Sequence, residues 1–375
     1  MDQPIRILNL FTIMNRGGAE TMVMNYYRKI DRTKVQFDFM VHRQERGAYD
    51  DEIESLGGRI FRMSPISLMT LNHYKRELHE FFQEHSEYRI LHAHMSEMAF
   101  FIFHEAVKHN IPVRICHAHS APNFRYESLT EKLKVLPRMC LVKFIRPLVT
   151  EKFCCSKEAG KWLFGDSINL IQMNNAIDAS LYKYNETTSI NLKQQMGWQN
   201  KIVWGHIGRL IKIKNQSFVI DLFYRYHGKN PNSILVLIGE GDDLIYLKKK
   251  VDDLKLSNVV FFMGSRSDVP LLLQGIDVFV FPSLYEGLPV SLIEAQAAGI
   301  PCVISDRIST QTHIIDCYYS VSLDASLQEW DNTIVKALKE GKKDTYSLIK
   351  QKGFDITENA LWLCDFYLKK YHQYE

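Results

Sequence analysis

The sequence lacks several features that would mark other classes of protein. It has no run of about 18 apolar residues, so no membrane-spanning helix is expected. Its start has no basic leader before an apolar run, which excludes a recognisable secretory signal. Seven scattered cysteines without CxxC spacing exclude a disulfide framework and favour reduced thiols. Neither charge predominates, with 46 Lys and Arg against 43 Asp and Glu, so a nucleic-acid partner is not expected. Together these absences predict a soluble, cytoplasmic protein.

The composition is that of a globular α/β protein with more than one domain. A length of 375 residues exceeds the roughly 100–150 residues of a single domain. Short apolar segments alternate with helical patterns in both halves, which favours parallel sheets covered by helices. The expected strands are residues 5–13, 35–42, 89–94, 113–120, 152–156, 201–208, 233–241, 259–264, 278–283 and 301–306. The expected helices are residues 19–30, 73–85, 214–228, 242–254, 268–274 and 289–298.

A polar, turn-rich stretch near 175–190 separates two halves of the same kind. We therefore expect an N-terminal domain over 1–180 and a C-terminal domain over 181–355, each the size of a Rossmann-like unit. Two such units would face each other across a ligand cleft. Residues 356–375 read as an amphipathic helix that packs back on the N-terminal domain.

The most informative segment surrounds Glu286. A strand is expected to end at Ser283, a turn carries Glu286 and Gly287, and Pro289 suits the first turn of a helix. The start of that helix attracts phosphate through its free N–H groups and its dipole. Glu294 follows Glu286 by eight residues, so it lies about one turn inside the helix. The alternative is that Glu286 caps the helix and Glu294 is a solvated helical residue.

Two further loops follow expected strands. Gly208 to Asn215 contains Arg209 and Lys214, whose cations can neutralise a leaving diphosphate, although a solvated basic loop would look similar. After the first strand, Gly17 and Gly18 allow close approach of the backbone to a ligand, or form a simple tight turn. The second loop does not match GxGxxG, so a dinucleotide fingerprint is not supported.

Histidines cluster in the first half. His92 and His94, and likewise His117 and His119, are two residues apart, so each pair lies on one face of a strand. Zinc favours imidazole ligands, but no carboxylate or cysteine cluster accompanies these pairs, so we predict no metal there.

Residues 132–146 hold five basic residues, no acidic residue and many bulky apolar ones. Such a stretch can contact an anionic membrane surface. A buried helix with a basic rim gives a similar pattern, and Pro137 interrupts it.

Residues 281–303, FPSLYEGLPVSLIEAQAAGIPCV, strongly resemble the glutamate-x7-glutamate signature of the retaining nucleotide-sugar glycosyltransferases of family 4. The order of motifs extends this resemblance over nearly the whole chain. It implies a GT-B fold and transfer of sugar from a nucleotide diphosphate, with UDP favoured as the nucleotide, to a sugar or lipid-linked sugar acceptor. No cofactor or metal is implied.

The resemblance also assigns roles in the second half. Glu286 would lie beside the transferred sugar, and Glu294 would hold the ribose. The amides of Gly287 and Leu288 would meet the sugar or the diphosphate, next to Pro289.

Other roles follow in the same way. Arg209 and Lys214 match the family's phosphate-binding pair, and Arg266 lies in the loop that holds the base, flanked by Gly239. Base contacts at that loop are largely made by the backbone. In the first half, Gly17 and Gly18 match the loop that closes over the donor phosphates.

A histidine at the end of the fourth N-domain strand contacts the donor sugar in the family. His119 matches that position best, with His117 as the alternative.

The chain departs from the family pattern at two places. Ala176 stands where relatives commonly carry glycine, which would be strained if the turn required a positive φ. Residues 307–311 replace a common Gly-Gly turn, and no donor contact is assigned to them.

The resemblance therefore predicts a retaining, metal-independent glycosyltransferase that acts in bacterial surface polysaccharide assembly, and the basic stretch 132–146 adds the alternative of a peripheral position on the inner face of the membrane. The alternatives are a GT-B epimerase or phosphorylase, and a non-catalytic GT-B partner subunit.

Overall fold

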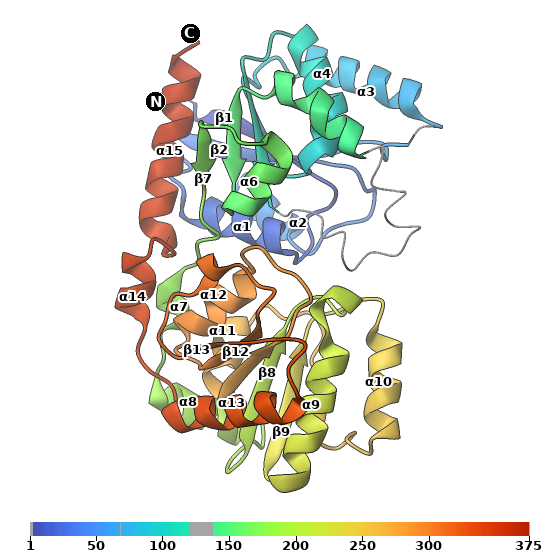
Figure 1. Ribbon diagram of the computed structural model, residues 1–375. Coiled ribbons are helices and arrows are strands. Elements are labelled where there is room, and N and C mark those ends of the chain that lie inside the picture. The colour runs from blue at the N-terminus through green and yellow to red at the C-terminus, as the bar shows by residue number, and fades with distance from the viewer. Residues whose placement is uncertain (1–2, 68, 120–137, 375) are drawn as a thin grey trace. The chain divides into compact units, whose positions relative to one another are not determined.

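A computed structural model describes residues 3–67, 69–119 and 138–374. The chain divides into two compact units (Figure 1). The first unit comprises Met1–Ala176 and Ile356–Glu375, and the second comprises Ile177–Asp355. The division thus falls a few residues before the boundary expected at 180.

The first unit is built on a seven-stranded parallel sheet with the order β3-β2-β1-β4-β5-β6-β7. All seven residues of β2 are buried, which is typical of a strand inside a parallel sheet covered on both faces. The strands are β1 (Ile5–Phe11), β2 (Val35–Val41), β3 (Ile60–Arg62), β4 (Ile90–Ala93), β5 (Val113–Ala118), β6 (Glu151–Cys154) and β7 (Leu170–Gln172).

Helices flank this sheet. The last helix, α15 (Ile356–His372), packs against α1 and β2, so the C-terminal segment belongs to the first unit (Figure 1). The other helices are α1 (Gly18–Lys29), α2 (Asp50–Ser55), α3 (Leu71–Glu84), α4 (Phe100–Lys108) and α6 (Lys157–Phe164), with 3-10 turns at Ser96–Ala99 and Arg146–Leu148. Residues 138–145 are also helical.

The second unit has a six-stranded parallel sheet with the order β10-β9-β8-β11-β12-β13. Counted from the first strand of this unit, the order is 3-2-1-4-5-6, the Rossmann arrangement, which binds ligands at the carboxyl ends of its strands. The strands are β8 (Ile202–Ile207), β9 (Ser233–Ile238), β10 (Val260–Phe262), β11 (Val278–Phe281), β12 (Cys302–Ser305) and β13 (Tyr318–Val321).

Helices of the second unit close a core that includes the buried Trp204 and Trp330. These helices are α7 (Ala179–Tyr182), α8 (Glu186–Gln195), α9 (Gln216–Lys229), α10 (Leu244–Asp253), α11 (Val269–Gly275), α12 (Val290–Ala297), α13 (Leu327–Glu340) and α14 (Tyr346–Gln351), with 3-10 turns at Lys212–Lys214 and Thr310–Thr312.

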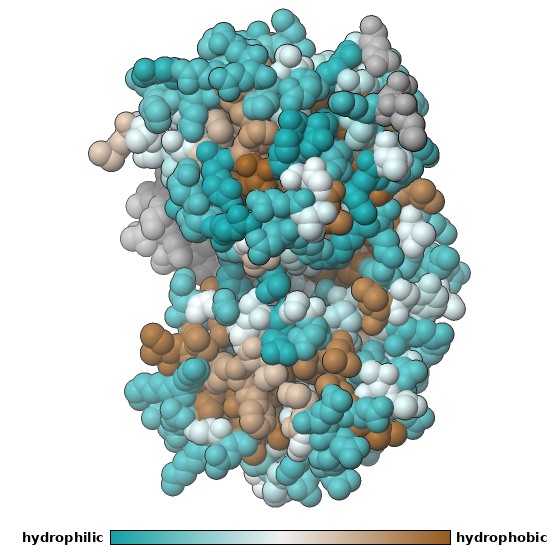
Figure 2. All heavy atoms as spheres, turned by 180° about the vertical axis from the view of Figure 1, so that it is seen from behind, coloured by the Kyte–Doolittle hydropathy of each residue, from teal (hydrophilic) through white to brown (hydrophobic). Residues whose placement is uncertain are grey.

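Surface hydropathy, helix length and the cysteines complete the description of the fold. Hydrophilic side chains dominate the visible face of the first unit, and some apolar side chains gather on that of the second (Figure 2). Within the described ranges, no helix combines the length and apolar character needed to cross a bilayer. All seven cysteines are free, and six of them are buried.

Candidate functional site

The carboxyl ends of β8 and β11 carry the two most informative motifs of the sequence, and the structure ties their loops together. The Leu284 amide donates to the Ile213 carbonyl at 2.8 Å. The Asn215 side chain donates to the Pro282 carbonyl at 3.1 Å. Asn215 adopts a left-handed conformation with φ of 57°, which asparagine tolerates better than most residues. The basic loop and the Glu286 loop are therefore one connected platform.

Lys214 and Glu286 meet on this platform. Their side chains form an ion pair between Nζ and Oε1, with 17% and 15% of each side chain exposed. The Lys214 ammonium also lies 5.2 Å from the centre of the Phe281 ring, a cation–π contact. The ammonium and the carboxylate are held in place but remain partly exposed to solvent, so an incoming anion can contact the ammonium.

Arg209 precedes this pair in the same loop and is exposed. Its backbone carbonyl accepts a hydrogen bond of 2.8 Å from the Gln216 side chain, which anchors the loop at the start of α9. Within the described part of the chain, the Arg209 guanidinium makes no hydrogen bond or ion pair. The planar guanidinium is therefore available to donate paired hydrogen bonds to a phosphate group.

Glu294 lies in α12, and only 7% of the residue is exposed. Its Oε1 accepts a hydrogen bond of 2.7 Å from the Tyr182 hydroxyl, which fixes the carboxylate. A carboxylate has about four acceptor positions, so it can accept further hydroxyl donors. The sequence did not single out Tyr182, because it lies 112 residues away and no local pattern links it to Glu294.

The turn before α12 is also held by its surroundings. Pro289 is the N-cap of α12 rather than its first helical residue. Gly287 and Leu288 lie between it and Glu286. The Glu286 backbone pairs with Ile308, and its carbonyl accepts from the Ser309 amide at 3.2 Å. The loop at 307–311, which lacks the common Gly-Gly turn, therefore supports the backbone of Glu286.

Gly239 ends β9 beside this platform. Its φ is +138°, and a Cβ atom there would lie 2.1 Å from the Gly208 carbonyl oxygen. Only glycine fits, because the backbones after β8 and β9 approach each other closely. The Gly239 amide also donates to the Gly264 carbonyl at 2.9 Å. This hydrogen bond joins the loop after β10 to the loop after β9.

Arg266 lies in the loop after β10. Its guanidinium forms two hydrogen bonds with Asp268, at 2.8 and 2.6 Å. The neighbouring Ser265 amide donates to Glu240 at 3.3 Å. The structure thus brings the predicted donor-binding residues of the second unit to one edge of its sheet, and shows that the Arg266 side chain is paired within its own loop.

Gly17 and Gly18 open α1 in the first unit. Gly17 is the N-cap, and a Cβ atom on it would lie 2.3 Å from the Glu20 carboxylate. A Cβ atom on Gly18 would meet no described atom within 4 Å. Packing among the described residues therefore requires no glycine at position 18, and none of their atoms fills the space beside it.

Ala176 does not show the backbone strain that a positive φ would cause at this position. Its φ is not positive, since Ser96, Asn110, Asn200, Asn215 and Lys255 are the non-glycine residues of the described chain with that conformation. Ala176 is fully buried, and its carbonyl accepts from Asn25 at 3.1 Å.

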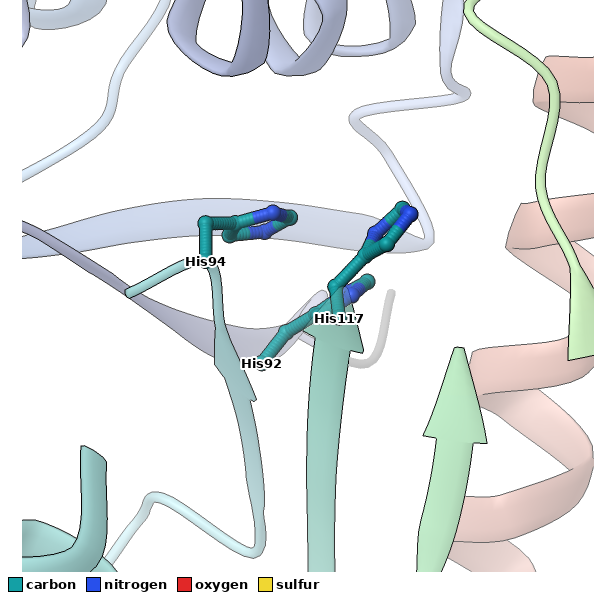
Figure 3. Close-up of side chains that lie close together, drawn as sticks. All are labelled: His92, His94 and His117. Atoms are coloured by element: carbon teal, nitrogen blue, oxygen red, sulfur yellow. The ribbon is translucent and has the colours of Figure 1, made fainter. Parts of the chain in front are cut away.

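The four histidines in and directly after β4 and β5 form a stack. His92 and His94 lie 4.3 Å apart between ring centres, and His117 stacks on His92 at 5.5 Å (Figure 3). His119 Nε2 lies 2.9 Å from His94 Nδ1, and Tyr367 of α15 bonds His92 Nδ1 at 2.6 Å.

Burial determines the charge of the stack. It lowers the pKa of His92 to about 3 and the pKa of His94 and His117 well below the usual value, so these rings are neutral. A metal binds in the plane of an imidazole ring, whereas the His92 ring is stacked against those of His94 and His117, at interplanar angles of 28° and 16°. The rings of His94 and His117 are tilted by 44°. Their arrangement therefore favours a stack over a chelate.

The family model for glycosyl transferases group 1 matches residues 189–351, which include the whole platform of the second unit. The chain is 34% identical to the putative glycosyltransferase EpsF of Bacillus subtilis, over 96% of each chain. It is 27% identical to the UDP-Gal:alpha-D-GlcNAc-diphosphoundecaprenol alpha-1,3-galactosyltransferase of Escherichia coli, over 75% of this chain and 76% of that protein.

A solved structure shares the fold of both units. The crystal structure of Anabaena HepE in complex with UDP and glucose superposes with a TM-score of 0.78 and 20% sequence identity. The match covers 97% of this chain and 99% of HepE.

Proposed function

Because the chain belongs to the glycosyl transferases group 1 family and is a GT-B glycosyltransferase, we propose that it is a retaining, metal-independent enzyme of family 4. It moves a hexosyl or N-acetylhexosaminyl group from a nucleotide diphosphate sugar to a hydroxyl acceptor. The observation that carries this proposal is the platform on which Lys214, Glu286 and Arg209 come together.

The charges on the platform suit the departure of a diphosphate. When the bond between the anomeric carbon and the diphosphate breaks, negative charge builds on the phosphate oxygens. Arg209 and Lys214 neutralise that charge, and Lys214 is already held in place by Glu286 and the Phe281 ring before the donor binds. The acceptor oxygen then bonds to the same carbon, and its proton passes to an oxygen of the departing diphosphate.

Two carboxylates contact the transferred sugar and the ribose of the donor. Glu286, beside Lys214, positions the transferred sugar and stabilises positive charge at its anomeric carbon. Glu294, which is fixed by Tyr182, accepts hydrogen bonds from the ribose hydroxyls. Gly239 and the loop of Arg266 flank the base, and the turn at Gly287, Leu288 and Pro289 faces the diphosphate.

The first unit supplies the acceptor side. We propose that Gly17 and Gly18 border the donor phosphates, because no described atom lies within 4 Å of the Cβ position of Gly18. His119 contacts the sugar hydroxyls as a neutral imidazole, since burial lowers its pKa. A neutral ring can donate or accept a hydrogen bond without a change of charge.

UDP is the favoured nucleotide, and a sugar or lipid-linked sugar is the favoured acceptor. HepE was crystallised with UDP and glucose, and the E. coli relative is named for transfer from UDP-Gal to a diphosphoundecaprenol-linked sugar. A capsular polysaccharide biosynthesis glycosyltransferase of Staphylococcus aureus is also related, at 24% identity over 98% of this chain. These names support a role in bacterial surface polysaccharide assembly.

A lipid-linked acceptor would bring the enzyme to the cytoplasmic face of the membrane. Within the basic stretch 132–146, residues 132–137 lie outside the described residues. Among the rest, Phe144 is 60% exposed next to the exposed Lys143, a pairing that suits an anionic lipid surface. Arg138 instead pairs with the buried Glu97.

A panel of nucleotide sugars tests the proposal. Selective binding raises the unfolding temperature by mass action, so a UDP-sugar should stabilise the protein more than the other nucleotide sugars do. Transfer to acceptor should proceed at an unchanged initial rate in EDTA, measured well below the unfolding temperature. Loss of rate that a divalent ion restores would contradict metal independence.

Incubation without acceptor separates the rival functions. A transferase hydrolyses its donor slowly, whereas an epimerase yields the epimeric nucleotide sugar and a phosphorylase yields a sugar phosphate when phosphate is added. A non-catalytic partner subunit would bind no donor or release no product.

A further inference from the structure

A compact group of potential metal ligands lies in the first unit, apart from every residue assigned above. His79 is on α3, Glu105 is on α4, and His109 is the residue that ends α4. Glu105 and His109 are four residues apart, so they share one face of the helix. That face meets His79 because α3 packs against α4.

The ligand atoms have the spacing of a coordination sphere. His79 Nδ1 lies 3.0 Å from Glu105 Oε1 and 3.0 Å from His109 Nε2. His109 Nε2 lies 3.6 Å from the same carboxylate oxygen. Zinc–nitrogen bonds of about 2.0–2.1 Å at tetrahedral angles separate neighbouring ligands by roughly 3.3 Å. The planes of the two imidazole rings meet at 56°, so their in-plane lone pairs can converge.

Hydrogen bonds alone leave this triangle unsatisfied. If His79 Nδ1 donates its proton to Glu105, a proton on His109 Nε2 faces the same carboxylate oxygen over 3.6 Å, which is too long for a hydrogen bond. If His109 Nε2 accepts the His79 proton instead, neither ring donates a hydrogen bond of normal length to Glu105 Oε1. A cation at the centre satisfies all three atoms.

The surroundings support such a site. Only 5% of the Glu105 side chain is exposed, and its other oxygen is held by Lys108 Nζ at 2.9 Å. The amide nitrogen of Gln83 lies 2.9 Å from His79 Nε2. With a metal on Nδ1, Nε2 carries the proton, and a turn of the Gln83 amide by 180° brings its oxygen into position to accept from it, the type of outer contact that orients metal-bound histidines.

We propose that His79 Nδ1, Glu105 Oε1 and His109 Nε2 bind a divalent transition metal of the zinc class. Two imidazoles and one carboxylate are ligands that zinc favours. Because 49% of the His79 side chain is exposed, water can take the fourth position. The metal links α3 to α4 and stabilises the first unit, and it takes no part in the transfer reaction.

The test uses the untagged, full-length protein after removal of metal with a chelator. Titration with zinc chloride should reveal one equivalent of bound zinc and a rise in unfolding temperature. His79→Gln and His109→Gln should each weaken zinc binding at least tenfold. His73→Gln, at an exposed histidine on the same helix, should bind zinc as the unaltered protein does. Cobalt in place of zinc should give the visible absorption of a tetrahedral site.

The proposal is wrong if the protein binds no zinc, or if both ligand variants bind it as tightly as the His73→Gln control. It is also wrong if binding survives in those variants but is lost in His117→Leu, which would place the metal in the buried stack. His79 is half exposed, so its variant remains informative if His109→Gln does not fold. These readouts are independent of activity and of donor binding.

Discussion

At the scale of single residues, the platform of the second unit depends on charges and backbones held close together. Lys214 contacts both the Glu286 carboxylate and the Phe281 ring, so its ammonium is fixed before any ligand arrives. Gly239 allows this arrangement, because the backbone after β9 lies against the Gly208 carbonyl. A side chain at that position would push the loops apart.

We therefore predict that Gly239→Ala lowers the free energy of unfolding by at least about 2 kcal/mol and weakens donor binding. The physical reasons are the positive φ and the contact of the added methyl group with backbone. Gly228→Ala is the matched control, since a Cβ atom there meets nothing within 4 Å on α9. It should raise stability by about 0.5–1 kcal/mol. Chemical denaturation measures both, and equal stabilities for the two variants would contradict the argument.

Much of the site could be predicted from residue order, because Arg209, Lys214, Glu286 and Glu294 lie in motifs that follow apolar strands. The pairing of Lys214 with Glu286 could not, because it depends on how two loops 72 positions apart are packed. The same holds for Tyr182 and Glu294, which belong to α7 and α12. Sequence patterns locate such residues along the chain, but only the folded sheet brings them into contact.

At the scale of elements, the histidine stack between β4 and β5 is the most unusual feature of the first unit. His92 lies in β4, His94 directly follows that strand, and His117 lies in the neighbouring β5; Tyr367 of α15 forms a hydrogen bond with His92. Among the described residues, neither ring nitrogen of His117 has a hydrogen-bond partner. The stack therefore folds only with neutral rings.

This arrangement predicts loss of stability in acid. The pKa of each buried ring is lowered by burial from 6.5, to about 3 for His92, so the unfolded chain binds more protons below pH 6.5. Stability is then fully present above pH 6.5 and falls as the pH drops toward 3. Each ring contributes about 1.4 kcal/mol per pH unit in that range.

Urea denaturation between pH 7.5 and 5 measures this slope. His117→Leu should reduce the slope of the unfolding free energy against pH by about 1.4 kcal/mol per pH unit, which corresponds to one proton. It should change the stability at pH 7.5 little, because His117 forms no hydrogen bond with the described residues. His73→Gln, at an exposed position, should leave the slope unchanged. A slope for His117→Leu equal to that of the unaltered protein would contradict the account.

The elements themselves were largely predictable. Each of the ten expected strands is present, and so are the expected helices, since buried parallel strands read as apolar runs. The strands β3, β7 and β13 were not expected. They have three or four residues each and lie at the edges of their sheets, so burial leaves little pattern on them.

At the scale of the whole molecule, the chain builds the same architecture twice and then returns to the first unit. It passes from the first to the second unit at Ala176 and back at Ile356. Next to the second of these crossings, the Ile177 amide donates to the Phe354 carbonyl at 2.9 Å. The repeated plan explains why one pattern of strands and helices could be recognised twice in the sequence. The role of each unit had to come from the residues at its strand ends.

The central claim is that the second unit neutralises a leaving diphosphate with Arg209 and Lys214. The rate of UDP release at saturating donor and acceptor tests it most directly, with Lys212→Ala as the control from the same exposed turn. Arg209→Ala and Lys214→Ala should lower that rate by several orders of magnitude, while Lys212→Ala stays near the unaltered rate. Near-normal rates for the first two variants would contradict the account.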